Sequence, residues 1–498
     1  MKKGEIEKNG VIETYSIDSE GLKVNVLIAS KEKQIPTYKL IFPIINPATE
    51  AVMDEIKQEL ITEVNITTTE ILDPTIINTL RKKFKEKSSV VISKYLPRIN
   101  EKTKDFLISM MLNEMLGLDK IELLLNDPNL EEIAINSASE SIRVYHKKHG
   151  WLETNIKPVT EAQIQNYANI IARRVGRQVT TLNPLLDAHL VTGDRANAVL
   201  YPVSTKGHSL TIRKFARDPW TVIDLIKNKT CPSDIFAMIW LAIQYEMTII
   251  ISGGTGSGKT TLLNVCMPFI PINHRIVSIE QTRELQLPKY LHWVPLTIRQ
   301  PSQEGKGEVT MLDLLINSLR MRPDRIVLGE IRTKEEAEVL FEAMHTGHSV
   351  YATLHADNVT ETIRRLVNPP ISVPANLLTA VNLNLVAFRD RRTNIRRIYQ
   401  IGEFIGSEDE EKISVKPNII YRWKPTTDTI VQHSSSLRLF EELSRHTGLT
   451  NKEINSDIAE KKKILDFMVK SNIRDSESVG QTIMNYYLDN KNIFKKQK

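Results

Sequence analysis

The residues most able to do chemistry lie between positions 249 and 261, where a short apolar run meets a cluster of glycines. The stretch reads Ile249-Ile-Ile-Ser-Gly-Gly-Thr-Gly-Ser-Gly-Lys-Thr-Thr261, and it places four of the chain's 20 glycines within six positions. It fits the pattern G-x-x-x-x-G-K-[ST], a loop that follows a strand and opens a helix. Because glycines let successive backbone N–H groups point inward, the loop is predicted to bind nucleotide phosphates.

The individual residues of this loop are expected to have distinct roles. Lys259 would reach the β- and γ-phosphates, and the hydroxyl of Thr260 would hold Mg²⁺. The helix that begins here adds its N-terminal partial positive charge. A plain glycine-rich turn with a surface lysine is the simpler alternative, and a dinucleotide-binding loop would leave the Lys-Thr pair without a role. The predicted nucleotide-binding residues are Gly253, Gly254, Thr255, Gly256, Ser257, Gly258, Lys259, Thr260 and Thr261.

Two glutamates follow apolar runs and could complete an ATPase site. Ile326-Val-Leu328 is followed by Gly329-Glu330, which is typical of a Walker B strand end, and Glu280 ends the run 276–279. Carboxyl ends of parallel strands are where sites form in α/β sheets. One carboxylate would serve the metal and the other would polarise water, and the residues leave open which does which. Helix capping is the alternative role for Glu330.

Histidines and arginines supply further candidates. His348 and His355 bracket a strand predicted over 349–354, and a strand of this length is about 20 Å long, which argues against one shared metal site. Ordinary core or surface histidines are the alternative. Arginines recur at the ends of elements, where salt bridging competes with charge stabilisation at the γ-phosphate, in cis or across a subunit boundary. These arginines are Arg195, Arg213, Arg320, Arg322 and Arg332.

The length and composition of the chain limit the class of protein to which it can belong. A chain of 498 residues suggests two to four domains, and its 41% hydrophobic and 25% charged residues are ordinary for a globular protein. It contains no run of 18 apolar residues and no apolar signal core at residues 1–8, so we expect neither a transmembrane helix nor a signal peptide. Two cysteines exclude a tetracysteine zinc site and favour a reducing cytoplasm.

From residue 247 onward, apolar strand-like runs alternate with helical segments, which indicates an α/β fold with a parallel sheet. Five segments in this region occur in one order, and together they resemble the type II/type IV secretion ATPase superfamily, the hexameric traffic ATPases. The resemblance covers about residues 125–400. The segments are the Walker A loop 253–261, the Asp box 278–284, the stretch 319–324, the Walker B end 329–332 and the His box 346–357. The flanking stretches 144–152, 211–215 and 445–448 are similar to the archaeal branch that serves pili and archaella.

The resemblance implies a RecA-like P-loop ATPase domain preceded by an α/β N-terminal domain, with six subunits in a ring. It places the N-terminal domain and the ATPase domain on either side of a flexible linker. The expected division is a mixed α/β N-terminal extension over 1–120, the N-terminal domain over 121–217, a linker over 218–233, the ATPase domain over 234–400 and a mostly helical region over 401–498.

The resemblance also implies a function. ATP hydrolysis with Mg²⁺ would move the N-terminal domain against the ATPase core, and the ring would push on a polytopic membrane platform protein to assemble or secrete pilus-like subunits. The protein would be cytoplasmic and peripherally associated with the inner face of the membrane. The residues carried over by position are Lys259 and Thr260 for phosphate and Mg²⁺, Glu280 as the Asp-box carboxylate, Glu330 as the Walker B carboxylate and metal ligand, the pair His348 and His355, and Arg195 and Arg213 as nucleotide-facing arginines.

Two positions depart from the family pattern. Gln281 stands where an aspartate is usual, and His345 stands where a small apolar residue is usual. Glutamine can orient water but cannot act as a base, so turnover could be reduced or differently tuned. Neither change touches the Walker A loop or Glu330, and we expect an active ATPase.

Other functions fit the same motifs. A DNA-translocating or conjugative-transfer ATPase ring is the main alternative, and a non-catalytic nucleotide-gated scaffold is another. A nucleic-acid motor should show a basic, aromatic-interleaved channel, which the formal charge of +6 and the sequence do not suggest, so nucleic acid is not an expected partner. The basic stretch 81–87 is most simply a solvated helix face, with an anionic membrane surface as the alternative partner.

Overall fold

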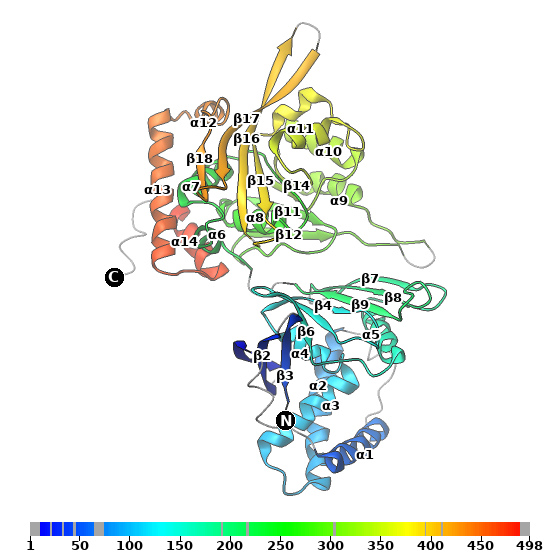
Figure 1. Ribbon diagram of the computed structural model, residues 1–498. Coiled ribbons are helices and arrows are strands. Elements are labelled where there is room, and N and C mark those ends of the chain that lie inside the picture. Colours follow the sequence, from blue (N-terminus) through cyan, green and yellow to red (C-terminus); the bar gives the residue numbers. More distant parts are fainter. Residues whose placement is uncertain are drawn as a thin grey trace. The chain divides into compact units, whose positions relative to one another are not determined.

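In the computed structural model the chain divides into two compact units, Met1–Arg217 and Asp218–Lys498. The structure describes residues 10–19, 22–31, 34–42, 46–63, 74–190, 193–215, 219–301, 305–393, 395–409 and 412–488. The segment 1–8, on which the expectation about a signal peptide rests, lies outside this set. Each unit contains one mixed sheet with helices packed on it (Figure 1), and this confirms the predicted α/β class. None of the helices described is both long and apolar enough to cross a bilayer.

The first unit is a sheet in the order β1-β2-β3-β6-β5-β4-β9-β8-β7, in which only β3 and β6 pair in parallel. Its strands are β1 (Val11–Ser19), β2 (Leu22–Lys31), β3 (Gln34–Ile41), β4 (Leu130–Ile135), β5 (Arg143–His146), β6 (Gly150–Thr154), β7 (Leu185–His189), β8 (Arg195–Val199) and β9 (Ser209–Arg213). Its helices are α1 (Pro47–Glu63), α2 (Pro74–Tyr95), α3 (Glu101–Leu116), α4 (Ile121–Asn126) and α5 (Glu161–Arg174). The strand residues alternate between buried and accessible positions, as expected for a sheet with one covered face.

Residues 1–120 and 121–217, which we expected as separate regions, share this sheet and one hydrophobic core. The hydroxyls of Tyr15 and Tyr38 each donate to Asp127 Oδ2 at 2.7 Å. Asp127 is fully buried, so these bonds satisfy a carboxylate that would otherwise be costly to bury. These two hydrogen bonds connect β1 and β3 to Asp127, which lies near the start of the region 121–217.

The second unit is a sheet in the order β12-β11-β13-β14-β10-β15-β16-β17-β18. The strands from β12 to β15 run parallel, and β15 to β18 pair antiparallel. Strand β10 leads into the glycine-rich loop and is flanked by β14 and β15. The strands are β10 (Ile249–Gly253), β11 (Arg275–Glu280), β12 (His292–Thr297), β13 (Arg325–Leu328), β14 (Ser349–Leu354), β15 (Leu383–Arg389), β16 (Arg396–Asp409), β17 (Lys412–Lys424) and β18 (Thr429–Gln432).

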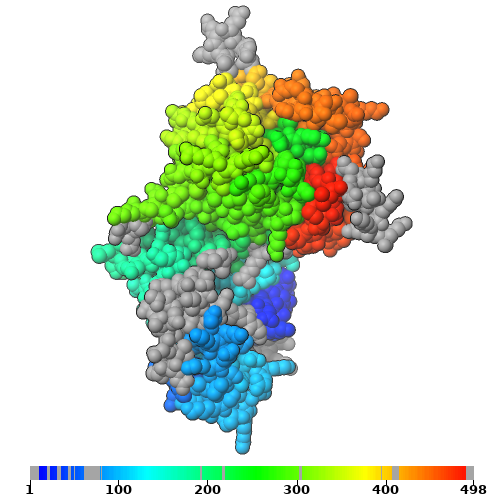
Figure 2. Space-filling model, turned by 180° about the vertical axis from the view of Figure 1, so that it is seen from behind, coloured from blue at the N-terminus to red at the C-terminus, as the bar shows by residue number. Residues whose placement is uncertain are grey.

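Helices cover both faces of this sheet (Figure 1), and each face has its own apolar core. The helices are α6 (Val222–Lys227), α7 (Ser233–Gln244), α8 (Lys259–Cys266), α9 (Met311–Ser318), α10 (Lys334–His345), α11 (Val359–Val367), α12 (Leu439–Thr447), α13 (Asn451–Lys470) and α14 (Ser476–Leu488). Helices α9, α10 and α11 pack on one face, and α7, α8, α13 and α14 pack on the other. The space-filling view shows α14, in red, directly against the green part of the same unit (Figure 2). There Trp240 stacks on Phe269 with ring centroids 5.2 Å apart.

Three features of this unit differ from the sequence expectations. The segment 218–233, expected as a linker, contains α6, which begins with a capping box between Thr221 and Asp224. Strand β12 was not predicted because its residues, including Pro295, are only partly buried and lie at the edge of the sheet. The region 401–498 is less helical than expected, since β16, β17 and β18 extend the sheet and the hairpin of β16 and β17 projects beyond it (Figure 1).

Candidate active site

The glycine-rich loop connects the buried end of β10 to the first turn of α8. Gly253 has φ +148°, and a Cβ at this position would lie 2.3 Å from the carbonyl oxygen of Ala387 on the neighbouring strand β15. Gly256 and Gly258 also have positive φ, +73° and +94°. Side chains are strained or excluded at these three positions, so glycine is required by the backbone itself. Ser257 Oγ closes the turn by donating to Gly254 O at 2.8 Å.

We predict that Gly253→Ala destabilises the second unit and abolishes nucleotide binding, because the new methyl group would push β10 and β15 apart. Gly347→Ala is the matched control, since Gly347 also has a positive φ, +94°, but a Cβ there meets nothing within 4 Å. The control should cost only backbone strain, on the order of 1–2 kcal/mol. Melting temperatures of both variants measure the difference, and equal losses would show that the clash with Ala387 does not matter.

The side chain of Lys259 lies over the loop and faces the ends of two other strands. Its Nζ donates to Gly254 O at 3.2 Å and lies 3.4 Å from Nδ1 and 3.5 Å from Nε2 of His355. Burial lowers the pKa of Lys259, while the nearby carboxylate of Glu330 opposes this shift. An ammonium group poised over a concave backbone loop is suited to bind the terminal phosphates of a nucleotide.

Glu330, just beyond β13, contacts two cationic or titratable partners. Its Oε1 lies 3.2 Å from His355 Nε2, and its Oε2 accepts hydrogen bonds from Arg332 Nε at 2.8 Å and Nη2 at 2.6 Å. Arg332 also donates to the side-chain oxygen of Gln281. The pKa of His355 is lowered, first by burial and then by Lys259. The result is a continuous chain of contacts from Lys259 through His355, Glu330 and Arg332 to Gln281.

Glu280 ends β11, the strand next to β13, so its position and that of Glu330 are neighbours at the carboxyl edge of the sheet. Its side chain is 2% exposed, and its Oε1 accepts from the backbone N–H groups of Glu284 at 2.9 Å and Leu285 at 3.0 Å. Its Oε2 is buried without a hydrogen-bond partner. Burial raises the pKa of Glu280 to about 7, despite the opposing effect of the two backbone hydrogen bonds.

This pKa predicts a pH dependence of stability in the nucleotide-free protein. Because the folded-state pKa is raised from 4.5 to about 7, folding favours the protonated carboxyl, and its stabilisation is complete below pH 4.5 and lost as pH rises through about 7. The loss amounts to about 3 kcal/mol. The melting temperature of the wild type should therefore fall relative to that of Glu280→Gln between pH 5 and 8. Parallel profiles would contradict the assignment, and Glu335→Gln, an exposed glutamate on α10, is the control.

The structure brings together most of the loop and carboxylate residues predicted from the sequence, and the contacts of three further predicted residues are described within their own units. His348 precedes β14 at the end opposite His355, and its Nδ1 lies 3.2 Å from Ala343 O. Arg195 and Arg213 face each other on β8 and β9 of the first unit, where Arg195 forms a bidentate pair with Asp187 at 2.9 and 2.8 Å. Catalytic roles for these three residues stay predictions.

Three residues next to the loop were missed as site residues by the sequence reasoning. A Cβ on Gly254 would lie 3.0 Å from Asp357 Oδ1, and one on Gly256 would lie 2.9 Å from Arg389 Nη1. Arg396 Nε donates to Gly256 O at 3.4 Å. Asp357 follows β14 and the two arginines lie on β15 and β16, so only the pairing of β10 with both β14 and β15 brings them here.

The residues present fit a nucleotide with a bound cation. The glycines leave open backbone where any side chain would intrude, which suits the close approach of phosphate oxygens. Thr260 lies in the first turn of α8, and Glu330 supplies a carboxylate beside Lys259 and His355. These two residues would hold Mg²⁺, a hard cation that prefers oxygen ligands. The unpartnered Oε2 of Glu280 is a further oxygen whose need for a donor or cation is unmet within the described residues.

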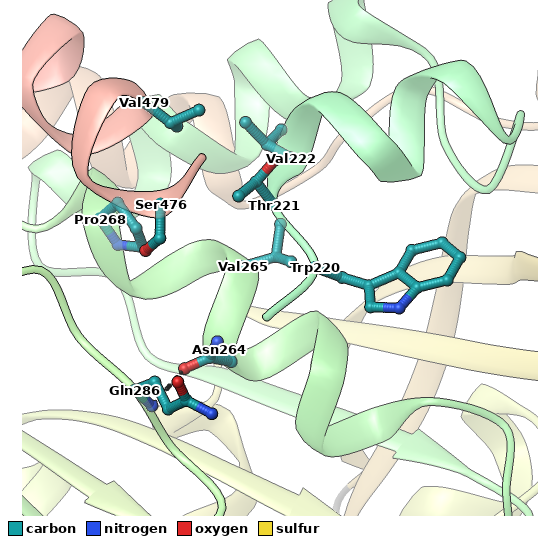
Figure 3. Close-up of a pocket in the computed structure, with 9 residues that line it drawn as sticks. All are labelled: Trp220, Thr221, Val222, Asn264, Val265, Pro268, Gln286, Ser476 and Val479. Carbon is teal, nitrogen blue, oxygen red and sulfur yellow. Dashed lines mark hydrogen bonds between the residues drawn. The ribbon is translucent and has the colours of Figure 1, made fainter. Parts of the chain in front are cut away.

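A second hollow lies at the other end of α8 (Figure 3). It is lined by residues from the chain before and within α6, from the end of α8, from the segment after β11 and from α14. These residues are Trp220, Thr221, Val222, Asn264, Val265, Pro268, Gln286, Ser476 and Val479. Gln286 N donates to Asn264 Oδ1 at 2.8 Å and so ties the segment that follows Glu280 to α8. This hollow carries none of the predicted catalytic groups.

The chain is similar to several known proteins. Residues 117–390 match the family described as Type II/IV secretion system protein. The protein MJ0900 of Methanocaldococcus jannaschii is 35% identical over 396 residues, which cover 78% of this chain and 71% of that protein. The type IV secretion system protein PtlH of Bordetella pertussis is 32% identical over 264 residues, 49% of this chain and 77% of PtlH. The X-ray structure of the Legionella pneumophila ATPase DotB is 20% identical with a TM-score of 0.39, covering 72% of this chain and 93% of DotB. The family match spans more than half of the sequence, and the chain belongs to the Type II/IV secretion system protein family.

Proposed function

We propose that this protein is an ATPase that hydrolyses ATP to ADP and phosphate and uses the energy as a motor. The observation that carries the proposal is the contact of Lys259, in the glycine-rich loop, with His355, which in turn contacts the carboxylate of Glu330. This arrangement joins a phosphate-binding loop to an acidic group at the carboxyl edge of a parallel sheet, which is what nucleotide hydrolysis requires.

Each group has a role that follows from its position. Lys259 and the backbone of the loop would bind the phosphates, and Thr260 with Glu330 would hold Mg²⁺, which neutralises phosphate charge when bound. Glu280, whose Oε2 is unpartnered, would accept a proton from the attacking water, a task that suits a carboxylate with a pKa of about 7. Gln281 is held by Arg332 and would orient water rather than act as a base.

The motor proposal extends to assembly and partners. As a member of the secretion family, the protein would work as a homohexamer on the inner face of the cell membrane and act through a polytopic platform protein on pilus-like subunits. PtlH, one of its relatives, is named as a protein of a type IV secretion system, which supports a secretion role. The proposal includes Arg195 and Arg213 of the first unit as nucleotide-facing arginines.

The first experiment measures phosphate release by the purified wild type with Mg-ATP, together with light scattering in a non-hydrolysable ATP analogue. We expect hydrolysis above background and a mass six times that of the chain. Background hydrolysis with tight ATP binding would instead favour a nucleotide-gated scaffold. A monomer at every concentration would overturn the ring.

The partner is tested separately by adding the candidate platform protein in vesicles or, in parallel, single-stranded and duplex DNA. Stimulation of hydrolysis by the platform protein supports the filament motor. Strong stimulation by DNA and none by the platform protein would favour a DNA-translocating ring.

A further inference from the structure

Beyond the residues already assigned, two arginines border the glycine-rich loop on the side away from the acidic groups. Arg389 ends β15 and Arg396 begins β16, and they face each other across this antiparallel pair. Arg396 Nε donates to Gly256 O at 3.4 Å, and its Cδ would be 3.7 Å from a Cβ on Gly258. A Cβ on Gly256 would lie 2.9 Å from Arg389 Nη1. Both guanidinium groups therefore lie within reach of whatever the loop binds.

The strand order explains why the loop has two chemically different sides. Strand β10, which carries the loop, lies between β14 and β15. On the β14 side are His355, Asp357 and Glu330, and Lys259 Nζ is directed toward this side by its contacts with His355. On the β15 side are Arg389 and Arg396. The carboxylates of Glu330 and Asp357 therefore lie on one side of the loop, and the guanidinium groups of Arg389 and Arg396 lie on the other.

This polarity orients a nucleotide along the loop. The lysine of a P-loop reaches the β- and γ-phosphates, while the loop backbone cradles the α- and β-phosphates. Because Lys259 faces the β14 side, the γ-phosphate end belongs there, and the α-phosphate with its nucleoside belongs on the β15 side. A phosphate bound on this side of the loop could accept charge-assisted hydrogen bonds from both guanidinium groups.

We propose that Arg389 and Arg396 form a binding site for the α-phosphate of the nucleotide, a site that ATP and ADP share. The proposal rests on the proposed function, since it names how that same nucleotide is held. Of the nearby arginines, Arg397 pairs with Asp428 at 2.6 and 2.7 Å, and Arg392 is almost fully exposed in the turn between the strands. The site would retain ADP after hydrolysis as firmly as it binds the α-phosphate of ATP.

The test compares the affinities of the full chain for ADP and for a non-hydrolysable ATP analogue by calorimetry. The variants are Arg389→Gln and Arg396→Gln, each with its lysine counterpart, and Arg392→Gln is the matched control in the same turn. Each glutamine variant should bind both nucleotides about 10-fold more weakly, as expected for the loss of a charge-assisted hydrogen bond. The lysine variants should recover part of the loss, and the control should bind as the wild type does.

Each other outcome has a distinct meaning. Unchanged affinity for both nucleotides in both glutamine variants would overturn the proposal. Loss for the ATP analogue alone would also overturn it, because it would assign the arginines to the γ-phosphate. A wild type that binds neither nucleotide would overturn the proposed function instead. Melting temperatures without nucleotide separate loss of binding from loss of fold. A glutamine variant that does not fold is replaced by its lysine counterpart. That lysine variant is expected to bind both nucleotides several-fold more weakly than the wild type.

Discussion

Lys259→Ala should reduce ATP hydrolysis by at least about 100-fold while leaving the fold intact, because a single preorganised cationic donor in an active site is typically worth this much in rate. Among the described residues, Lys259 Nζ contacts the loop carbonyl of Gly254 and the ring of His355, so its removal should disturb little packing. It deletes the one side-chain ammonium group that lies over the loop among the described residues. Phosphate release with Mg-ATP and the melting temperature measure the two parts of the prediction.

Lys334→Ala is the control for this experiment. Lys334 lies at the start of α10, is half exposed and pairs only loosely with Glu338 at 3.4 Å, so an exposed lysine is removed without touching the loop. Its turnover should match the wild type. Turnover of Lys259→Ala within a few-fold of the wild type would refute the assignment of the loop as the hydrolytic site.

Glu330→Gln should nearly abolish turnover and yet preserve or strengthen nucleotide binding. The substitution keeps the shape of the side chain and removes its negative charge, which in the structure faces His355 at 3.2 Å and Arg332 at 2.6 and 2.8 Å. Arg332 and Lys259 would then lack this counter-charge, and they would attract the polyanionic nucleotide more strongly. In the proposed role, catalysis would lose a metal ligand and should fall by about 100-fold or more.

Calorimetry with ADP and single-turnover phosphate release separate the two effects. Glu338→Gln is the control, because Glu338 is half exposed on the surface of α10 and pairs with Lys334 at 3.4 Å. Weaker nucleotide binding together with normal turnover in Glu330→Gln would contradict the proposed role. An equal loss of both would show that Glu330 mainly supports the local structure.

Much of this site could be predicted from local sequence patterns. The pattern G-x-x-x-x-G-K-T located the loop, and the strand-end positions of Glu280 and Glu330 were predicted from apolar runs followed by an acid. Such signals lie within a few residues of one another, and their chemistry is fixed by backbone shape. The buried strands of the parallel sheet could also be predicted, because residues covered on both faces form continuous apolar runs.

What could not be predicted depends on pairing between distant segments. Arg389 and Arg396 reach the loop only because β15 lies beside β10, and the sequence shows no more than a hairpin with a charged turn. The hydrogen bond from Arg332 to Gln281 could not be predicted for the same reason, although both residues were noticed singly. The first part of β16 was predicted over 395–400, whereas β17 and β18 were missed because their partly accessible residues give no periodic apolar signal.

The buried Asp127, with its two tyrosine partners on β1 and β3, has a consequence for how the chain folds. A truncation that begins at residue 121 would remove both phenol donors, Tyr15 and Tyr38, and would leave the edge of β6 unpaired where β3 now lies. The remaining carboxylate would be exposed to water or left buried without two of its donors, and the sheet would present an open template for association. Residues 1–120 and 121–217 should therefore melt in a single cooperative transition, as one folding unit rather than as two independently folding domains.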